Sequence, residues 1–437
     1  MEPKKFQGVS RRKFVKTGAG VVAAGALLGK RAFAAPRPIK IGYVTPRTGG
    51  LAPFGEADTF VFEEVRKYVQ GGVKIGGTTR SVEILVRDTQ SSPNRAAEVA
   101  TSLIKSDQVD LILAAGTPDT VIPVSDQCEI NQMPCLTTDT PWQVWYFVRG
   151  GKPDKGFDWT YHFFFGIDLV TELTCDIFDL LPTNKIVAGL WANDTDGIFE
   201  SDPVHGQPAI FKQRGYTTID PGRFDANIND FSAQISAFKK ANADLVHGAV
   251  SLPVFTNFWN QVAQQGYKPK NCTFGKAILF PADVEALGPL GKYLTNEVWW
   301  SPAYPFKSSL TGQSAAQLCD AWVDRMHKQW PMLLGCRYAL FEVALDTLKR
   351  AQNPESNASV NQALRATKLN TIQGPLQWEG PPPNQWVTIP NKNVCTTPIA
   401  AGQWVLGAKF MYDLAVIDNR RYPSIPVQRK IMPLQWA

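Results

Sequence analysis

Short apolar runs alternate with longer amphipathic stretches after residue 38. The runs are typical of strands and cover residues 39–44, 82–86, 110–115 and 134–138. The stretches repeat apolar residues near the 3.6-residue spacing of a helix and cover residues 56–70, 94–105 and 120–131. Strands that alternate with helices of about a dozen residues predict βαβ units, and therefore a parallel sheet flanked by helices.

The same alternation begins again after residue 184. Strands are predicted at 185–191 and 243–250, and helices at 205–215, 231–241 and 254–265. Two long amphipathic helices follow at 314–330 and 336–351, and the last third of the chain looks like short strands and loops. A chain of 437 residues is too long for one hydrophobic core, so the pattern predicts two α/β lobes of similar size.

The first 34 residues have the pattern of an export signal. The paired arginines Arg11 and Arg12 precede an apolar stretch at 21–28, and an Ala-Phe-Ala sequence at 32–34 provides small residues of the kind that a signal peptidase recognises. The alternative is a basic, disordered N-terminus beside one amphipathic helix. We expect residues 1–34 to be a twin-arginine-type signal peptide, followed by a periplasmic mature chain that does not span the membrane.

The positive charge of the chain comes from this leader. The formal net charge is +6, but eight of the 45 lysines and arginines and only one of the 39 acidic residues lie within residues 1–34. The remaining chain is nearly neutral, which argues against nucleic acid or an anionic membrane as its partner.

Motifs of common enzyme classes are lacking. The sequence has no HExxH, GxSxG, GxGxxG or P-loop motif, and its four histidines do not have metal-ligand spacing. We expect no enzyme activity, no metal and no cofactor. An exported enzyme with a catalytic pair of carboxylates stays open as an alternative.

Several short segments resemble one family when they are taken in order. They are Ile39-Lys40-Ile41-Gly42, Thr48 to Gly55, Arg87-Asp88-Thr89-Gln90, Ala114 to Pro118 and Gly374 to Trp378. Together they resemble the type I periplasmic binding proteins of the branched-chain amino acid (Leu/Ile/Val) ABC transporters. The resemblance implies a two-lobed Venus-flytrap, with lobe 1 at residues 36–160 and 301–370 and lobe 2 at 161–300 and 371–437. It also implies a monomer that binds a small-molecule solute between its lobes and delivers it to the membrane permease of an ABC importer.

The resemblance places solute-binding residues in the loops of lobe 1. Phe54 would pack against the solute, or alternatively against its own lobe. Gly116, Thr117 and Thr120, at the start of a predicted helix, would provide N–H and hydroxyl groups for a carboxylate. Asp119 lies in the same loop, where capping of the helix is favoured over contact with the solute.

The remaining candidates lie farther along the chain. Thr140 would contribute a hydroxyl and Trp142 an apolar wall, unless Trp142 belongs to a packed aromatic cluster at the connection between the lobes. Asp194 lies in an Asp-Thr-Asp-Gly sequence, for which a turn is favoured over a calcium site because the other EF-hand ligands are lacking. Relatives that bind amino acids pair the α-ammonium with an acidic residue, and the corresponding position here is Ala277, next to Lys276.

This departure makes an α-amino acid less favourable as the solute. A buried ammonium without a counter-charge costs on the order of several kcal/mol. Either Asp194 or Asp119 replaces the missing acid, or the solute has no ammonium. We favour the second interpretation, in which Lys276 could attract an anion and the solute is a small carboxylate or amide, aromatic solutes included. A branched-chain amino acid binding protein and a sensory module of the same fold are the alternatives.

Overall fold

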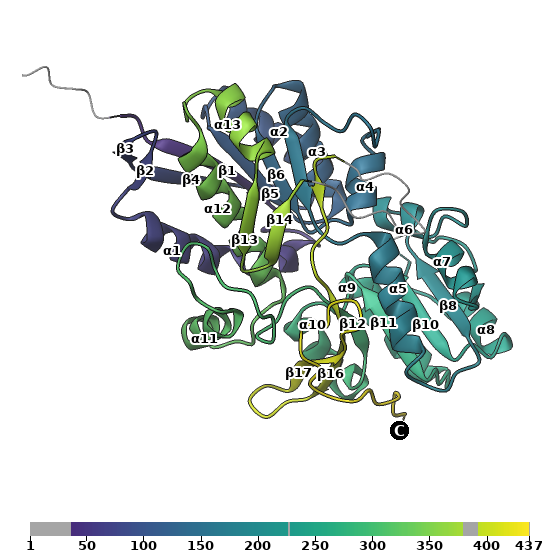
Figure 1. Ribbon diagram of the computed structural model, residues 1–437. Helices are drawn as coiled ribbons and strands as arrows, with labels where there is room; N and C mark the ends of the chain where they lie inside the picture. Colours follow the sequence, from purple (N-terminus) through teal and green to yellow (C-terminus); the bar gives the residue numbers. More distant parts are fainter. Residues whose placement is uncertain (1–35, 226–227, 379–391, 437) are drawn as a thin grey trace, which may run out of the picture. The chain divides into compact units, whose positions relative to one another are not determined.

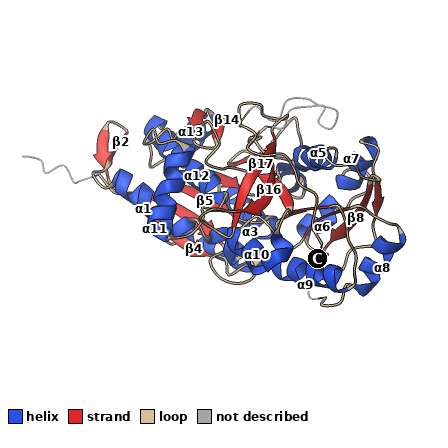
Figure 2. Cartoon of the chain, turned by 90° about the horizontal axis from the view of Figure 1, so that it is seen from below, coloured by secondary structure: helices blue, strands red, loops and turns tan. Residues whose placement is uncertain are grey.

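A computed structural model describes residues 36–225, 228–378 and 392–436, so the predicted signal peptide lies outside the described residues. The strands form two large sheets and two short pairs (Figure 1). Blue helices lie on both sides of the red strands in Figure 2, which confirms the predicted α/β class. None of the described helices is long and apolar enough to cross a membrane.

The first sheet has six parallel strands in the order β15-β7-β6-β5-β1-β4. They are β1 (Ile39–Thr45), β4 (Val82–Asp88), β5 (Leu111–Ala115), β6 (Cys135–Thr138), β7 (Thr160–Phe163) and β15 (Val394–Cys395). The limits predicted for the two lobes stay a prediction, although the strand pairing places β7 and β15 with this sheet.

Helices cover both faces of the first sheet because successive side chains of a strand point to opposite faces. Tyr43 of β1 contacts Phe62 of α1 (Asp58–Val69) and Phe341 of α12 (Leu333–Arg350). The next residue, Val44, belongs instead to a core with Val99 of α2 (Pro93–Lys105) and Val124 of α3 (Pro118–Ile130). This double burial explains the continuous apolar runs in the sequence.

The second sheet has seven strands in the order β17-β16-β12-β11-β10-β8-β9. Five are parallel: β8 (Ile186–Trp191), β9 (Thr217–Ile219), β10 (Leu245–Ala249), β11 (Asn271–Gly275) and β12 (Thr295–Val298). The C-terminal strands β16 (Ala400–Leu406) and β17 (Tyr412–Asp418), yellow in Figure 1, extend this sheet in antiparallel pairing. The prediction of a parallel sheet therefore holds for the first five strands and not for the C-terminal pair.

The remaining helices and strands connect or cover these sheets. The helices are α4 (Trp142–Phe147), α5 (Ile167–Phe178), α6 (Thr195–Glu200), α7 (Gln207–Gln213), α8 (Ser232–Lys240), α9 (Leu252–Gln264), α10 (Pro281–Ala286), α11 (Ala315–Met326) and α13 (Asn357–Arg365). The short pairs are β2 (Val73–Ile75) with β3 (Thr78–Arg80) and β13 (Lys368–Thr371) with β14 (Gly374–Gln377). The turn expected after Asp194 is wrong, because helix α6 begins there.

Candidate functional site

A pocket lies at the carboxyl ends of strands from both sheets. Its empty volume is about 560 Å³, part of which is open to solvent. The residues that line it are Phe54, Thr117, Pro118, Asp139, Pro141, Phe164, Phe165, Val170, Asp196, Glu200, Gln207, His247, Gly248, Ala249, Gly275, Lys276, Leu279, Glu297 and Trp299. Parallel α/β sheets bind ligands at this end of their strands, so the pocket is the candidate site.

Three residues proposed from the sequence line the pocket. Phe54 is buried and packs edge-on against Phe280, with 5.2 Å between the ring centroids. Thr117 precedes α3 and is 2% exposed, and its Oγ1 has no hydrogen-bond partner among the described residues. Lys276 follows β11. The roles of these residues in binding stay a prediction.

Gly116, Thr120 and Thr140 are buried next to the pocket but do not line it. The Thr120 Oγ1 donates a hydrogen bond to the carbonyl of Thr117 (3.2 Å), and the Thr140 Oγ1 donates to the carbonyl of Gly116 (3.3 Å). Gly116 has φ of +142°, and a Cβ there would lie 2.7 Å from the Thr120 Oγ1. Thr120 and Thr140 therefore stabilise the loop, because their hydroxyls donate hydrogen bonds to its backbone carbonyls.

Asp119 and Trp142 also lie outside the lining. The Asp119 Oδ1 accepts a hydrogen bond from the Thr195 Oγ1 (2.6 Å), which connects the start of α3 to the start of α6. The N-cap residue of α3 is Thr117, so the expectation that Asp119 caps this helix is wrong. Trp142 is 1% exposed and packs near Tyr146 and Phe147. Trp142 therefore belongs to a packed aromatic cluster, which was the alternative to an apolar wall for the solute.

Lys276 is held by two aspartates of α6. Its Nζ lies 2.9 Å from the Asp194 Oδ2 and 2.7 Å from the Asp196 Oδ2. Asp194 also caps α6 by accepting a hydrogen bond from the backbone N–H of Gly197 (2.8 Å). Burial alone would lower the pKa of Lys276, but the two aspartates outweigh it and raise that pKa. The ammonium is therefore charged and already neutralised, which weakens its predicted role in attracting an anion.

Sequence reasoning missed the two glutamates of the pocket. Glu200, at the end of α6, is 6% exposed, and Glu297 of β12 is 5% exposed. The Glu297 Oε1 accepts a hydrogen bond from the Trp299 Nε1 (3.3 Å). The Glu200 Oε2 is buried without a hydrogen-bond partner among the described residues. The sequence contains only a weak signal for these two residues. Glu297 lies near the end of the short strand β12, but nothing local relates it to Glu200.

Burial governs the titration of the pocket. It raises the pKa of Glu297 to about 7 and that of Asp196 to about 6. Burial and the neighbouring Asp196 raise the pKa of Glu200 well above its usual value. Burial lowers the pKa of His247 to about 4, so this imidazole is neutral at pH 7. The pocket is therefore rich in carboxyl groups that would ionise more readily beside a positive charge.

A buried arginine supports the pocket from the first sheet. Arg337 of α12 is 0% exposed, and its Nη2 lies 2.8 Å from the Asp139 Oδ2. The same guanidinium donates to the Tyr43 Oη (3.1 Å) and to the backbone carbonyl of Phe54. Asp139 thus has its own counter-charge, and Arg337 fixes two of the segments that line the pocket.

Solved structures with similar folds come from solute-binding proteins. A leucine-binding protein from Thermotoga maritima is 17% identical, with a TM-score of 0.67 over 88% of this chain and 99% of that chain. A branched-chain amino acid binding protein from Streptococcus pneumoniae in complex with isoleucine is 15% identical, with a TM-score of 0.67 over 87% and 100%. A solute-binding protein from Rhodopseudomonas palustris in complex with 4-hydroxybenzoate is 15% identical, with a TM-score of 0.68 over 87% and 96%.

The sequence itself carries the family assignment. A family profile described as periplasmic binding protein matches residues 38–388, which is most of the chain. The similar structures have the same fold at low identity, and the resemblance seen in the sequence is confirmed. The chain belongs to the periplasmic binding protein family, whose members are solute-binding proteins.

Proposed function

We propose that this protein is the exported substrate-binding protein of an ABC importer and that it captures a small organic solute between two lobes. The observation that carries the proposal is the pocket, which residues at the strand ends of both sheets line in a member of a solute-binding family. The pattern at residues 1–34 supports export to the periplasm, and the partner would be the membrane permease of the importer.

One end of the solute would lie against Thr117. Its Oγ1 has no partner within the described part of the chain and is available to a carboxylate or amide oxygen, and Phe54, Phe164 and Trp299 provide aromatic walls. Two similar structures contain aromatic acids, 4-hydroxybenzoate and 3,4-dihydroxybenzoic acid. A carboxylate or amide group, aromatic solutes included, is therefore the group that we assign to this end of the pocket.

A thermal-shift screen of the mature chain tests this function. We expect small acids or amides to raise the melting temperature, because a ligand that binds only the folded state stabilises it by mass action. Calorimetry on the strongest of them should then show about 3- to 10-fold weaker binding for Thr117→Val, in keeping with the loss of one hydrogen bond.

Thr217→Val, at an exposed position on β9, is the matched control and should bind like the wild type. Failure of every solute that carries a carboxylate or amide group to bind would contradict the proposed solute class. Turnover of a solute by the purified chain would contradict the transport function.

A further inference from the structure

Around the pocket, acidic side chains outnumber basic ones, which is unusual for a protein interior. Lys276 is paired with Asp194 and Asp196, and Arg337 is paired with Asp139 and, at 3.8 Å, with Asp58. Each base thus already faces two carboxylates. Burying a further carboxyl group without a partner costs free energy, so such groups are rare in interiors.

Glu200 and Glu297 are nevertheless buried at the pocket wall. Neither forms a direct ion pair within the part of the chain that the structure describes, and the Glu200 Oε2 has no hydrogen-bond partner there either. Gly275 lies next to the Glu297 carboxyl group: a Cβ added there would be in ordinary van der Waals contact, 3.5 Å from the Glu297 Oε1. Glu200 is therefore incompletely satisfied, and Glu297 is hydrogen-bonded but has no counter-charge among the described residues. Buried acids of this kind are typical of a binding site.

Aromatic rings stand next to Glu297. The Trp299 ring centroid lies 4.8 Å from that of Phe164 and 5.7 Å from that of Phe165, and all three side chains line the pocket. The faces of such rings attract cations, most strongly when the site is dry. Carboxyl groups and aromatic ring faces therefore both favour a cationic group at this wall of the pocket.

We propose that Glu200, Glu297 and Trp299 form a subsite for a protonated nitrogen of the solute. The inference rests on the proposed function, since it assigns the second end of the solute in the same pocket. Amines, guanidinium groups and quaternary ammonium groups have the required chemistry. This differs from the expectation of a solute without an ammonium, which follows from Ala277 alone, because Glu200 and Glu297 provide acidic groups that position 277 lacks.

Matched sets of solutes test the subsite. One set is leucine, 3-methylbutylamine and 4-methylpentanoate, and a second is phenylalanine, 2-phenylethylamine and 3-phenylpropanoate, with 4-hydroxybenzoate and 4-(aminomethyl)benzoate added. Thermal shifts of the mature chain select the best binder, and calorimetry measures its affinity. We expect the best binder to carry a protonated nitrogen, and Glu297→Gln to weaken it about 10-fold or more, because the hydrogen bond to a charged group is lost.

Glu200→Gln should have an effect of the same direction, and Glu83→Gln, at an exposed position on β4, should have none. Unliganded melting temperatures no lower than that of the wild type would show that the variants fold. If acids bind and their nitrogen-bearing counterparts do not, or if both pocket variants bind the best solute as the wild type does, the subsite is wrong while solute capture stands. If no solute of any class binds, the proposed function itself fails.

Discussion

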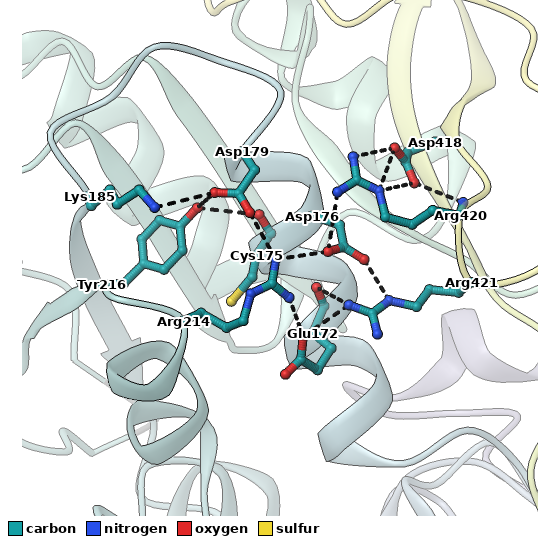
Figure 3. A network of polar contacts seen from close by, with 10 residues as sticks. All are labelled: Glu172, Cys175, Asp176, Asp179, Lys185, Arg214, Tyr216, Asp418, Arg420 and Arg421. Atoms are coloured by element: carbon teal, nitrogen blue, oxygen red, sulfur yellow. Dashed lines mark hydrogen bonds and ion pairs between the residues drawn. The ribbon is translucent and has the colours of Figure 1, made fainter. Parts of the chain in front are cut away.

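Two groups of buried carboxylates, on α5 and in the pocket, differ in what surrounds them. Asp176 of α5 is 1% exposed and has three arginine partners, at 3.0 Å (Arg214), 3.5 Å (Arg420) and 2.6 Å (Arg421). Glu172 and Asp179 belong to the same network, which Figure 3 shows at close range. The glutamates of the pocket are buried almost as deeply and have no such partners among the described residues.

The difference separates packing from binding. The α5 network joins three distant segments, since Arg214 follows α7 and Arg420 and Arg421 follow β17. Its charges are satisfied within the protein, so its role is to fix the C-terminal segment against α5. The pocket leaves Glu200 and Glu297 without a counter-charge among the described residues, and the proposed solute would supply one.

The comparison predicts its largest effect at Arg337, whose removal would turn satisfied acids into unsatisfied ones. Arg337→Leu leaves Asp58 and Asp139 buried without their counter-charge. We expect the free energy of unfolding to fall by roughly 3–5 kcal/mol, measured by denaturant unfolding. Arg325→Leu breaks the more exposed pairs with Glu63 and Glu64 and should cost about 1 kcal/mol or less. Equal losses for the two variants would contradict the argument.

A smaller loss is expected within the α5 network. Asp176→Asn keeps the shape of the side chain but leaves three arginines close together without their shared acid. Because these arginines are partly exposed, we expect the free energy of unfolding to fall by roughly 1–3 kcal/mol. Solute affinity at a temperature where the variant is folded should not change. Asp324→Asn, at an exposed position on α11, is the control.

The same network surrounds helix α5, one of the helices that the sequence pattern did not predict. The apolar runs predict β1, β5, β8 and β10, because those strands are buried on both faces. Helix α5 is amphipathic in its sequence, but its polar residues Thr171, Glu172 and Asp176 are as buried as its apolar ones. Their burial depends on arginines from distant segments, which no local pattern contains.

The position of the pocket could be predicted from the sequence, but only some of the residues that line it could. The strand-end rule and the family resemblance located the loops of Phe54, Thr117 and Lys276. Thr120 and Thr140, proposed from the same loops, lie outside the pocket lining, and their hydroxyls donate to backbone carbonyls of the loop. Glu200 and Glu297 are nearly a hundred positions apart, so only the tertiary fold brings them to one pocket.

Removing a pocket carboxyl group should raise the free energy of unfolding, whereas Asp176→Asn should lower it. Glu297→Gln replaces a buried acid that has no ion pair by a neutral group of the same shape. We expect the free energy of unfolding without solute to rise by about 1 kcal/mol at pH 8, because binding sites retain groups that cost stability. Denaturant midpoints at equal slopes measure the change. A clear loss of stability would mean that Glu297 is a packing residue like Asp176.

The two groups of carboxylates should also differ in how they make the free energy of unfolding depend on pH. Burial raises the pKa of Glu297 to about 7, so between about pH 4.5 and 7 the folded form holds a proton that the unfolded form has released. The free energy of unfolding should therefore fall as pH rises through this window, with Glu200 and Asp196, also buried, contributing in the same direction.

Asp179 in the α5 network behaves in the opposite way. Burial alone would raise its pKa, but hydrogen bonds from Tyr216 and Arg214 outweigh it and lower that pKa, so its contribution to stability is lost only as pH falls below the usual range of an aspartate.

Unfolding of the wild type and of Glu297→Gln at pH 5 and pH 8 isolates the pocket contribution. The gain from the substitution should be larger at pH 8 by on the order of 1 kcal/mol. A gain that does not change with pH would show that Glu297 is ionised in the folded protein across this range, with a counter-charge that the pocket itself provides.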